Sequence, residues 1–369
     1  MSTPRTPVPA VEHLPRGLVT LADHEAHART HLDANAWAYF SGGAADEITL
    51  RANCAAWENL QLLPRVLRPL SGAHTQVQLL GRTLAHPMLV APMAWQTLAH
   101  ADGELAMAHA AAAQAAGLVL STQASLPLDA VAQAFGAYPE RGPLWFQLYM
   151  QADRGFTRDL ALRAQDTGYE ALVLTVDAPV SGSRDRERRA GFVLPQGIAS
   201  VNLAGAPTPT SPLVAAATWA DVEWLCSLTR LPVILKGVLH PDDAREAARM
   251  GVAALVVSNH GGRVLDTTIA TARALPAIAD AVGPGLPLLV DGGIRRGTDV
   301  FKALAMGASA VLIGRPCLWG LANAGAVGVA HVLRLLRDEF EMALLLCGCR
   351  EPAAISRDMV IANAMDSHL

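Results

Sequence analysis

The sequence predicts an α/β protein: a closed (β/α)8 TIM barrel with a helical N-terminal lid and one long loop after the fourth strand. From residue 87 onward, a short aliphatic run, a polar loop and a helical pattern follow one another eight times. The aliphatic runs do not alternate with polar residues, so each strand needs cover on both faces, as in a parallel sheet wrapped by helices. Eight such units over about 260 residues match the usual size of this barrel.

The repeat places the elements in order along the chain. The predicted strands cover residues 88–91, 118–121, 144–149, 171–176, 233–236, 254–258, 286–290 and 310–313. The predicted helices cover residues 101–116, 127–135, 153–167, 219–228, 241–250, 268–282, 296–306 and 322–346. A glycine directly follows six of these helices, as is typical where a helix ends.

A doubly wound open sheet is the structural alternative. Its usual G-x-G-x-x-G after the first strand is missing, because Pro92, Met93, Ala94 and Trp95 follow that strand instead. The barrel is therefore favoured.

Two segments interrupt the repeat within a single domain, residues 16–369. Residues 16–86 contain helical patterns at 21–32 and 46–60 and a hairpin signal around Gly81, and they precede the barrel at 87–348. Residues 178–218 form a connection long enough to be functional or disordered. Residues 1–15 are expected to be a loose arm, and residues 349–369 a C-terminal tail.

Composition excludes several classes of protein. The 29 basic and 33 acidic residues leave a net charge of -4, which provides no basic field for nucleic acid or an anionic membrane. The five cysteines form no C-x-x-C pair, so neither a disulfide framework nor a metal site is indicated. No signal peptide is apparent, and Gly117 divides the uncharged stretch 105–128, so we expect no membrane span and a cytoplasmic protein.

Polar residues gather where the strands end, which in this barrel is the active face. Singly, a strand-end aspartate is more often a cap and a lone histidine more often structural. As a set at one face of the barrel, these polar residues predict an active site. Its members are Gln147, Tyr149, Thr175, Asp177, Lys236, Ser258, His260, Arg263, Asp291, Arg295 and Arg315.

The last two strands predict an anion site. The first of them is followed by Asp291-Gly292-Gly293 and Arg295, and the second by Gly314-Arg315. Glycines in these loops let backbone N–H groups approach a phosphate, and the arginines add positive charge. The alternative is that both segments are ordinary tight turns.

The residues that follow the sixth predicted strand indicate acid–base chemistry. His260 can serve as a base and Arg263 as a carboxylate ligand. Asp177 can orient the imidazole, and a buried Lys236 must point into the site or be paired.

Long motifs in this order resemble one family. They are F-Q-L-Y (146–149), L-T-V-D (174–177), L-K-G (235–237), S-N-H-G-G-R (258–263) and D-G-G-I-R-R-G-T-D-V-F-K-A-L-A-M-G (291–307). The chain is similar over nearly its whole length to the FMN-dependent α-hydroxy-acid oxidases and dehydrogenases, such as glycolate oxidase, lactate oxidase and mandelate dehydrogenase.

The resemblance implies that FMN binds at the C-terminal end of the barrel. The cofactor-binding residues it implies are Pro92, Met93, Ala94, Ser121, Gln147, Thr175, Lys236, Ser258, Asp291, Gly292, Gly293, Arg295, Gly314 and Arg315. Among these, Lys236 would stabilise negative charge on the flavin.

The resemblance also implies the reaction. The carboxylate of an (S)-2-hydroxy acid would be held by Arg184, Arg263, Tyr39 and Tyr149, while His260 takes a proton with Asp177 as its partner and two electrons pass to the flavin. The catalytic set is then His260, Asp177, Tyr149 and Lys236.

Departures from relatives narrow the expected function. Gln123 stands where plant-type glycolate oxidases have tryptophan, so the pocket should be wider, suiting lactate-, mandelate- or longer-chain-like substrates. Ala94 favours O2 as acceptor, with H2O2 as product, over a dehydrogenase with another acceptor. A non-redox FMN barrel would not need the arginine and tyrosine set, and a silent scaffold would not need His260 and Lys236. By the same likeness we expect a homotetramer.

Overall fold

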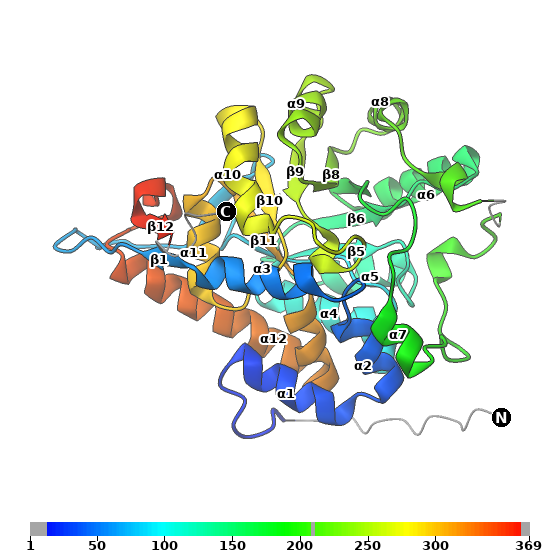
Figure 1. Ribbon diagram of the computed structural model, residues 1–369, viewed down its shortest axis with the longest axis horizontal. Helices are drawn as coiled ribbons and strands as arrows, with labels where there is room; N and C mark the ends of the chain where they lie inside the picture. The colour runs from blue at the N-terminus through cyan, green and yellow to red at the C-terminus, as the bar shows by residue number, and fades with distance from the viewer. Residues whose placement is uncertain (1–12, 208–210, 363–369) are drawn as a thin grey trace.

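The computed structural model describes residues 13–207 and 211–362 and confirms the predicted barrel (Figure 1). Eight parallel strands close into a ring in which each pairs with its neighbours in sequence and the last pairs with the first. The strands are β4 (Met88–Val90), β5 (Gly117–Ser121), β6 (Leu144–Leu148), β7 (Ala171–Thr175), β8 (Val233–Val238), β9 (Ala254–Val257), β10 (Leu288–Val290) and β11 (Ala310–Ile313).

Successive strand residues face two different cores, which explains why the runs are apolar throughout. Leu89, Val119, Ile234 and Leu312 belong to a buried cluster inside the barrel. Their strand neighbours, such as Val90, pack outward against the helices. The barrel interior is therefore filled with side chains, and the site must lie at its end.

Helices surround this ring, as the repeat predicts. They are α4 (Gly103–Ala113), α5 (Leu128–Gly136), α6 (Arg154–Thr167), α8 (Trp219–Leu228), α9 (Pro241–Arg249), α10 (Thr271–Val282), α11 (Gly297–Ala305) and α12 (Arg315–Leu346). α12 begins seven residues before its predicted start and is broken at Ala324 and Gly325, where the backbone leaves helical geometry. In the described part of the chain only α12 is long and apolar enough to span a bilayer, and 78% of its most apolar window is buried inside the molecule.

The N-terminal segment adds three helices beside the barrel. The predicted helices at 21–32 and 46–60 are α1 (Leu21–His31) and α3 (Ile48–Glu58). A third, α2 (Ala34–Ser41), was not predicted, because its aromatic and asparagine-containing sequence has low helix propensity. Asp33 caps it by accepting a hydrogen bond from the Ala36 amide. α2 brings Tyr39 to the site.

Two small sheets complete the fold. The predicted hairpin is β2 (Val77–Leu79) and β3 (Arg82–Leu84), with Gly81 at a φ of 77° in the turn. Its leucines join the cluster inside the barrel. The described part of the C-terminal tail forms β12 (Val360–Ala362), which pairs with β1 (Leu60–Leu62). The sequence did not predict this pairing.

The long connection after β7 contains α7 (Asp185–Ala190), which packs against α2. Ser200 accepts a hydrogen bond from Trp95 Nε1 at 2.9 Å, and Asn202 Oδ1 accepts one from the Leu128 amide at 2.9 Å. These contacts hold the connection over the loops that follow β4 and β5. Residues 208–210, within the same connection, lie outside the described residues.

Candidate active site

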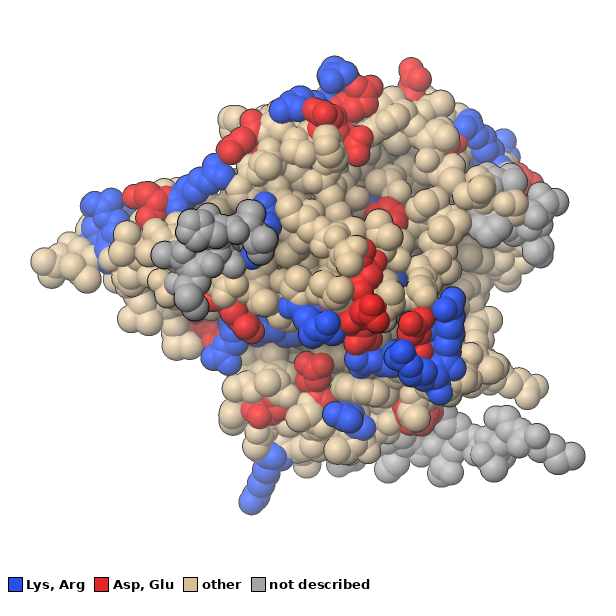
Figure 2. Space-filling model, viewed as in Figure 1, with Lys and Arg blue, Asp and Glu red and all other residues tan. Residues whose placement is uncertain are grey.

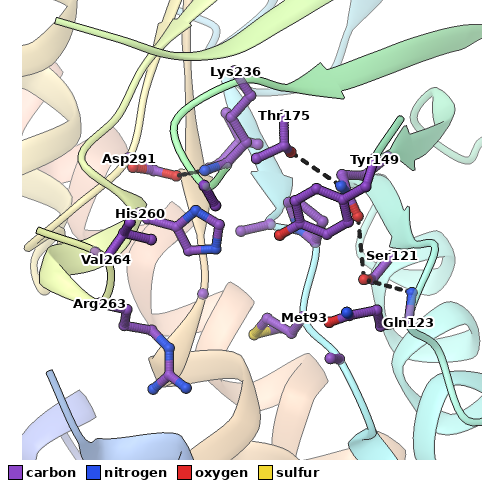
Figure 3. A pocket seen from close by; sticks show the side chains of 18 of the residues that line it. Met93, Ser121, Gln123, Tyr149, Thr175, Lys236, His260, Arg263, Val264 and Asp291 are labelled. Carbon is purple, nitrogen blue, oxygen red and sulfur yellow. Dashed lines mark hydrogen bonds and ion pairs between the residues drawn. The ribbon is translucent and has the colours of Figure 1, made fainter. Parts of the chain in front are cut away.

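A cavity of about 390 Å³ lies at the C-terminal end of the strands (Figure 3). Most of the predicted site residues line it. They are Tyr39, Pro92, Met93, Ala94, Ser121, Gln147, Tyr149, Thr175, Arg184, Lys236, His260, Arg263, Asp291, Gly292, Gly293, Arg295, Gly314 and Arg315. Asp177 and Ser258 lie behind this lining.

His260 and Asp177 come from different strand ends and meet directly. Asp177 Oδ1 lies 2.9 Å from His260 Nδ1. An Nδ1–H that donates to this carboxylate leaves Nε2 as the nitrogen able to accept a proton, and Figure 3 shows the imidazole pointing into the pocket. Burial alone would raise the pKa of Asp177, but His260 and Lys236 lower it below its ordinary value. Asp177 is therefore an ionised carboxylate that accepts this hydrogen bond.

Backbone geometry positions this pair. His260 has a φ of 57°, an unusual value for a residue with a side chain, and glycines follow at 261 and 262. Gly237 has a φ of 111°, and a Cβ there would lie 2.5 Å from Asp177 Cβ. Only glycine fits at 237, because the Asp177 side chain occupies that space.

Lys236 is the second charged group of the cavity. Its Nζ lies 3.0 Å from Asp291 Oδ2 and 2.8 Å from Ser258 Oγ. Burial lowers the pKa of Lys236, but Asp291 and Asp177 outweigh this and raise the pKa above its usual value. Ser258 Oγ also accepts a hydrogen bond from the His260 amide at 3.0 Å, so it links the two catalytic candidates. Its predicted contact with a cofactor stays a prediction.

A chain of hydrogen bonds lines one side of the cavity. Gln147 Oε1 accepts from Ser121 Oγ at 3.2 Å, and Gln147 Nε2 donates to Thr175 Oγ1 at 3.0 Å. All three side chains are buried at the ends of adjacent strands. They present a fixed polar edge, as the sequence predicts.

Arg184 and Arg263 face the same cavity from different directions. Arg263 Nη1 donates to the Tyr39 and Gly42 carbonyls at 2.6 and 2.9 Å, and its guanidinium lies 5.0 Å from the centre of the Tyr39 ring. Arg184 Nε is buried without a hydrogen-bond partner. Burial and the charge of Arg263 lower the pKa of Arg184 to about 10, so it remains a cation at neutral pH. The two cations can bind an anion in this cavity.

Two tyrosines, Tyr39 and Tyr149, line the cavity together with these arginines. Burial, followed by the Asp177 charge, raises the pKa of Tyr149, and burial also raises the pKa of Tyr39. Both phenols therefore keep their protons at neutral pH and can donate hydrogen bonds to a carboxylate.

Helix α3 supports the opposite end of the cavity. Asn53 and Asn259 exchange two amide hydrogen bonds of 2.8 Å, and Trp57 Nε1 donates to the Gly292 carbonyl at 2.8 Å. A Cβ on Gly293 would lie 2.2 Å from the Asn53 carbonyl oxygen. α3 therefore holds the loops after β9 and β10 together. The sequence gives no sign of Asn53, whose partner lies 206 residues away.

Arg315 lies at the same end of the cavity and makes hydrogen bonds that the sequence did not predict. Its Nε, Nη1 and Nη2 donate to the carbonyls of Phe40, Gly261 and Gly42 at 3.0, 3.0 and 2.9 Å. It thereby joins the N-terminal segment to the His260 loop. Burial, with the charges of Arg263 and Arg295, lowers its pKa to about 9. Among residues 13–207 and 211–362, no carboxylate forms an ion pair with Arg295 or Arg315.

This end of the cavity fits a bound phosphate group. The cations Arg295 and Arg315 have no carboxylate of their own in the described chain, and a Cβ on Gly314 would have no atom closer than 3.8 Å. Asp291 Oδ1 is buried without a partner, so it can accept a hydrogen bond from a hydroxyl or N–H group of the same ligand.

Several cavity residues were missed. Met150, Gln151, Leu203, Ala217 and Val264 also line it. Leu203 and Ala217 come from the long connection, where composition alone does not indicate which residues turn inward.

Comparisons with known proteins agree with this geometry. The model of the FMN-dependent dehydrogenase family matches residues 28–362. An L-lactate oxidase of Nostoc sp. is 49% identical over 348 residues, 90% of this chain and 95% of the relative. A 4-hydroxymandelate oxidase of Amycolatopsis orientalis is 43% identical over 352 residues, 92% and 97% of the two chains. The crystal structure of mandelate oxidase with (S)-2-phenylpropionate superposes with a TM-score of 0.86 at 44% identity, covering 92% of this chain and 97% of that one.

The chain belongs to the FMN-dependent dehydrogenase family. Within it, the chain is an FMN-dependent 2-hydroxy-acid oxidase, and FMN is its cofactor. The resemblance stated from the motifs is thus confirmed.

Proposed function

We propose that the enzyme oxidises (S)-2-hydroxy monocarboxylic acids to 2-oxo acids, with O2 as acceptor and H2O2 as product, and that L-lactate is among its substrates. The observation that carries the proposal is one cavity that joins a carboxylate-binding pair, Arg184 and Arg263, to a His260–Asp177 pair. Sequence identity of 49% and 45% to two L-lactate oxidases supports the choice of lactate.

The residues of the cavity divide between cofactor and substrate. Arg295, Arg315 and the glycines at 292, 293 and 314 would hold the FMN phosphate, and Asp291 would lie near the ribityl chain and accept a hydrogen bond from a hydroxyl there. Ala94, Gln147 and Lys236 would contact the ring. When bound, FMN supplies the two-electron oxidation and the reaction with O2.

The substrate end performs binding and proton transfer. Arg184, Arg263 and the two neutral tyrosines bind the carboxylate, which fixes the 2-hydroxyl carbon against the imidazole. His260 Nε2 accepts the proton that leaves the substrate, and Asp177 stabilises the resulting imidazolium. Lys236 remains a cation because Asp291 and Asp177 raise its pKa.

Aromatic 2-hydroxy acids are the second candidate substrates. Gln123, Met150, Leu203 and Ala217 line the cavity without a large aromatic side chain among them, which leaves room for a side chain larger than methyl. The 43% identity to a 4-hydroxymandelate oxidase supports the same candidates.

Peroxide formation tests both candidates. The purified holoenzyme should form H2O2 with (S)-lactate or (S)-mandelate and not with the R enantiomers, and Arg184→Lys should raise KM far more than it lowers kcat. Equal activity with both enantiomers, or an unchanged KM in R184K, would contradict the proposal.

We also propose a homotetramer in the cytoplasm. Exposed apolar residues near the paired strands β1 and β12 support self-association, with Leu67 fully exposed and Leu346 75% exposed. The five free cysteines support a reducing compartment. Light scattering after gel filtration measures the mass of the assembly, and fractionation of the source cells tests the compartment.

A further inference from the structure

Glu187, on α7, is shared by the two arginines of the substrate site. Its Oε1 lies 3.3 Å from Arg184 Nη1 and 3.4 Å from Arg263 Nη2. The three side chains are largely buried, at 21% exposure for Arg184, 16% for Arg263 and 15% for Glu187. Glu187 does not line the cavity, so it lies behind the arginines that do.

Two other bases of the cavity, Lys236 and His260, each have a carboxylate of their own. Lys236 pairs with Asp291, and His260 with Asp177. Arg184 and Arg263 instead divide one carboxylate between them. This end of the site therefore presents one unit of net positive charge, although two guanidinium groups face it.

Glu187 is held firmly in this position. The carbonyl of Glu187 accepts hydrogen bonds from the amides at the end of α7, including that of Phe192 at 2.9 Å. Next to it, Arg186 pairs with Glu47 and donates to Ser41 at 2.9 Å, which ties α7 to the N-terminal segment. Figure 2 shows acidic and basic side chains side by side where α7 lies in Figure 1. Helix α7 is thus fixed to the N-terminal segment, and the Glu187 carboxylate is held by the two arginines.

We propose that the Glu187 carboxylate, by its negative charge, makes the site selective for 2-hydroxy acids with a single carboxylate over those with two. This inference rests on the proposed function, in which Arg184 and Arg263 bind the substrate carboxylate. One carboxylate neutralises the net charge of the pair. A second substrate carboxylate would lose its hydration without finding a free positive charge, because Glu187 already neutralises the other guanidinium group.

Equilibrium binding of two acids that lack a hydroxyl tests the inference without turnover. Propionate carries one carboxylate and succinate carries two, and the Kd of each is to be measured from the change it produces in the absorption spectrum of bound FMN. In Glu187→Gln, the ratio of the succinate Kd to the propionate Kd should fall roughly tenfold at low salt, because one unit charge several ångströms away in a partly buried site is worth on the order of 1.4 kcal/mol. Glu187→Asp should keep the wild-type ratio.

The ratio of the two Kd values distinguishes the loss of the Glu187 charge from a loss of order in the two arginines. Loosened arginines would weaken the binding of both acids and leave the ratio unchanged, whereas loss of the carboxylate charge acts more strongly on the dianion. Glu187→Ala removes the same charge and serves as a second variant if E187Q does not retain FMN.

Asp185→Asn is the matched control. Asp185 lies on the same helix but pairs with Arg188 and Ser183, away from the substrate arginines. D185N should leave the ratio unchanged. The inference is overturned if E187Q and E187A keep the wild-type ratio, or if D185N lowers it as much.

A separate variant tests the underlying function. Arg184→Met should weaken propionate binding strongly. If propionate binds R184M as tightly as the wild type, the carboxylate role of the arginines is wrong, whatever the result for Glu187.

Discussion

Asp177 controls two properties of His260: which ring nitrogen faces the cavity and how well a positive charge on the ring is tolerated. Both follow from the 2.9 Å contact at Nδ1. Because the carboxylate is buried and its pKa is held below the ordinary value, it stays negative throughout the neutral range. This buried negative charge beside the imidazole is the reason for interpreting His260 as a base and not as a structural side chain.

Asp177→Asn should therefore lower kcat with (S)-lactate on the order of a hundredfold or more, while FMN content and KM change little. The amide can hold the ring but cannot stabilise the imidazolium. Rapid mixing without oxygen measures the loss of flavin absorbance directly. Wild-type reduction rates in D177N would remove Asp177 from the mechanism.

The sequence predicts most of these side chains because parallel strands end at one face of a barrel, so their trailing polar residues must converge. It does not predict Glu187 or Asn53. Each acts through partners brought close only by the folded chain: Asn53 contacts Asn259 across 206 positions, and Glu187 contacts Arg263 across 76. Arg315 was predicted as a phosphate ligand, and its hydrogen bonds to three carbonyls add a structural role that no motif contains.

Helix α3 joins the loops after β9 and β10, and its effect should appear in cofactor affinity. Asn53→Ala removes two hydrogen bonds from the buried Asn259 amide, which keeps only those with the Ile269 carbonyl and the Gly262 amide, and each lost bond costs about 0.5–1.5 kcal/mol. We expect FMN to dissociate at least tenfold more readily, as measured by fluorescence of the released flavin.

Asn35→Ala provides the comparison. Asn35 also makes two amide hydrogen bonds, both to the Val193 backbone, but at a half-buried position on α2 where these bonds are exposed to solvent. N35A should retain FMN as the wild type does. Equal losses in the two variants would show that α3 has no special part in holding the cofactor.

Secondary structure was predictable where local pattern decides it. All eight barrel strands are continuous apolar runs followed by helices, and the structure confirms each of them. The pairing of β1 with β12 was not predictable, since it joins residues about 300 positions apart in strands of three residues. The break in α12 at Ala324 and Gly325 was missed because both halves share one apolar pattern.

The stability of the whole molecule should depend on buried histidines distant from the site. Burial, with the charges of His331 and His27, lowers the pKa of His24 to about 4, and burial lowers that of His86 to about 4. Between pH 6.5 and 4 the unfolded chain binds protons that the folded chain does not. The free energy of unfolding therefore falls as the pH drops through this range, by about 2 kcal/mol for each histidine at pH 5.

Thermal unfolding of the holoenzyme at pH 7.5 and pH 5 measures this effect. The fall in Tm on acidification should be smaller in His24→Gln than in the wild type. His13→Gln changes an exposed histidine and should behave as the wild type. An equal fall in Tm for H24Q and the wild type would show that His24 does not contribute.

In the proposed function, one cavity joins a carboxylate site, a base and an FMN site, and we expect activity to depend on all three. The most direct test is an anaerobic titration of the holoenzyme with (S)- and (R)-lactate, followed by admission of air. We predict loss of the oxidised-flavin absorbance with the S enantiomer only, and its rapid return with one H2O2 per flavin. Absorbance that stays unchanged with (S)-lactate and with every other 2-hydroxy acid, or that fails to return in air, would contradict the assignment as an oxidase.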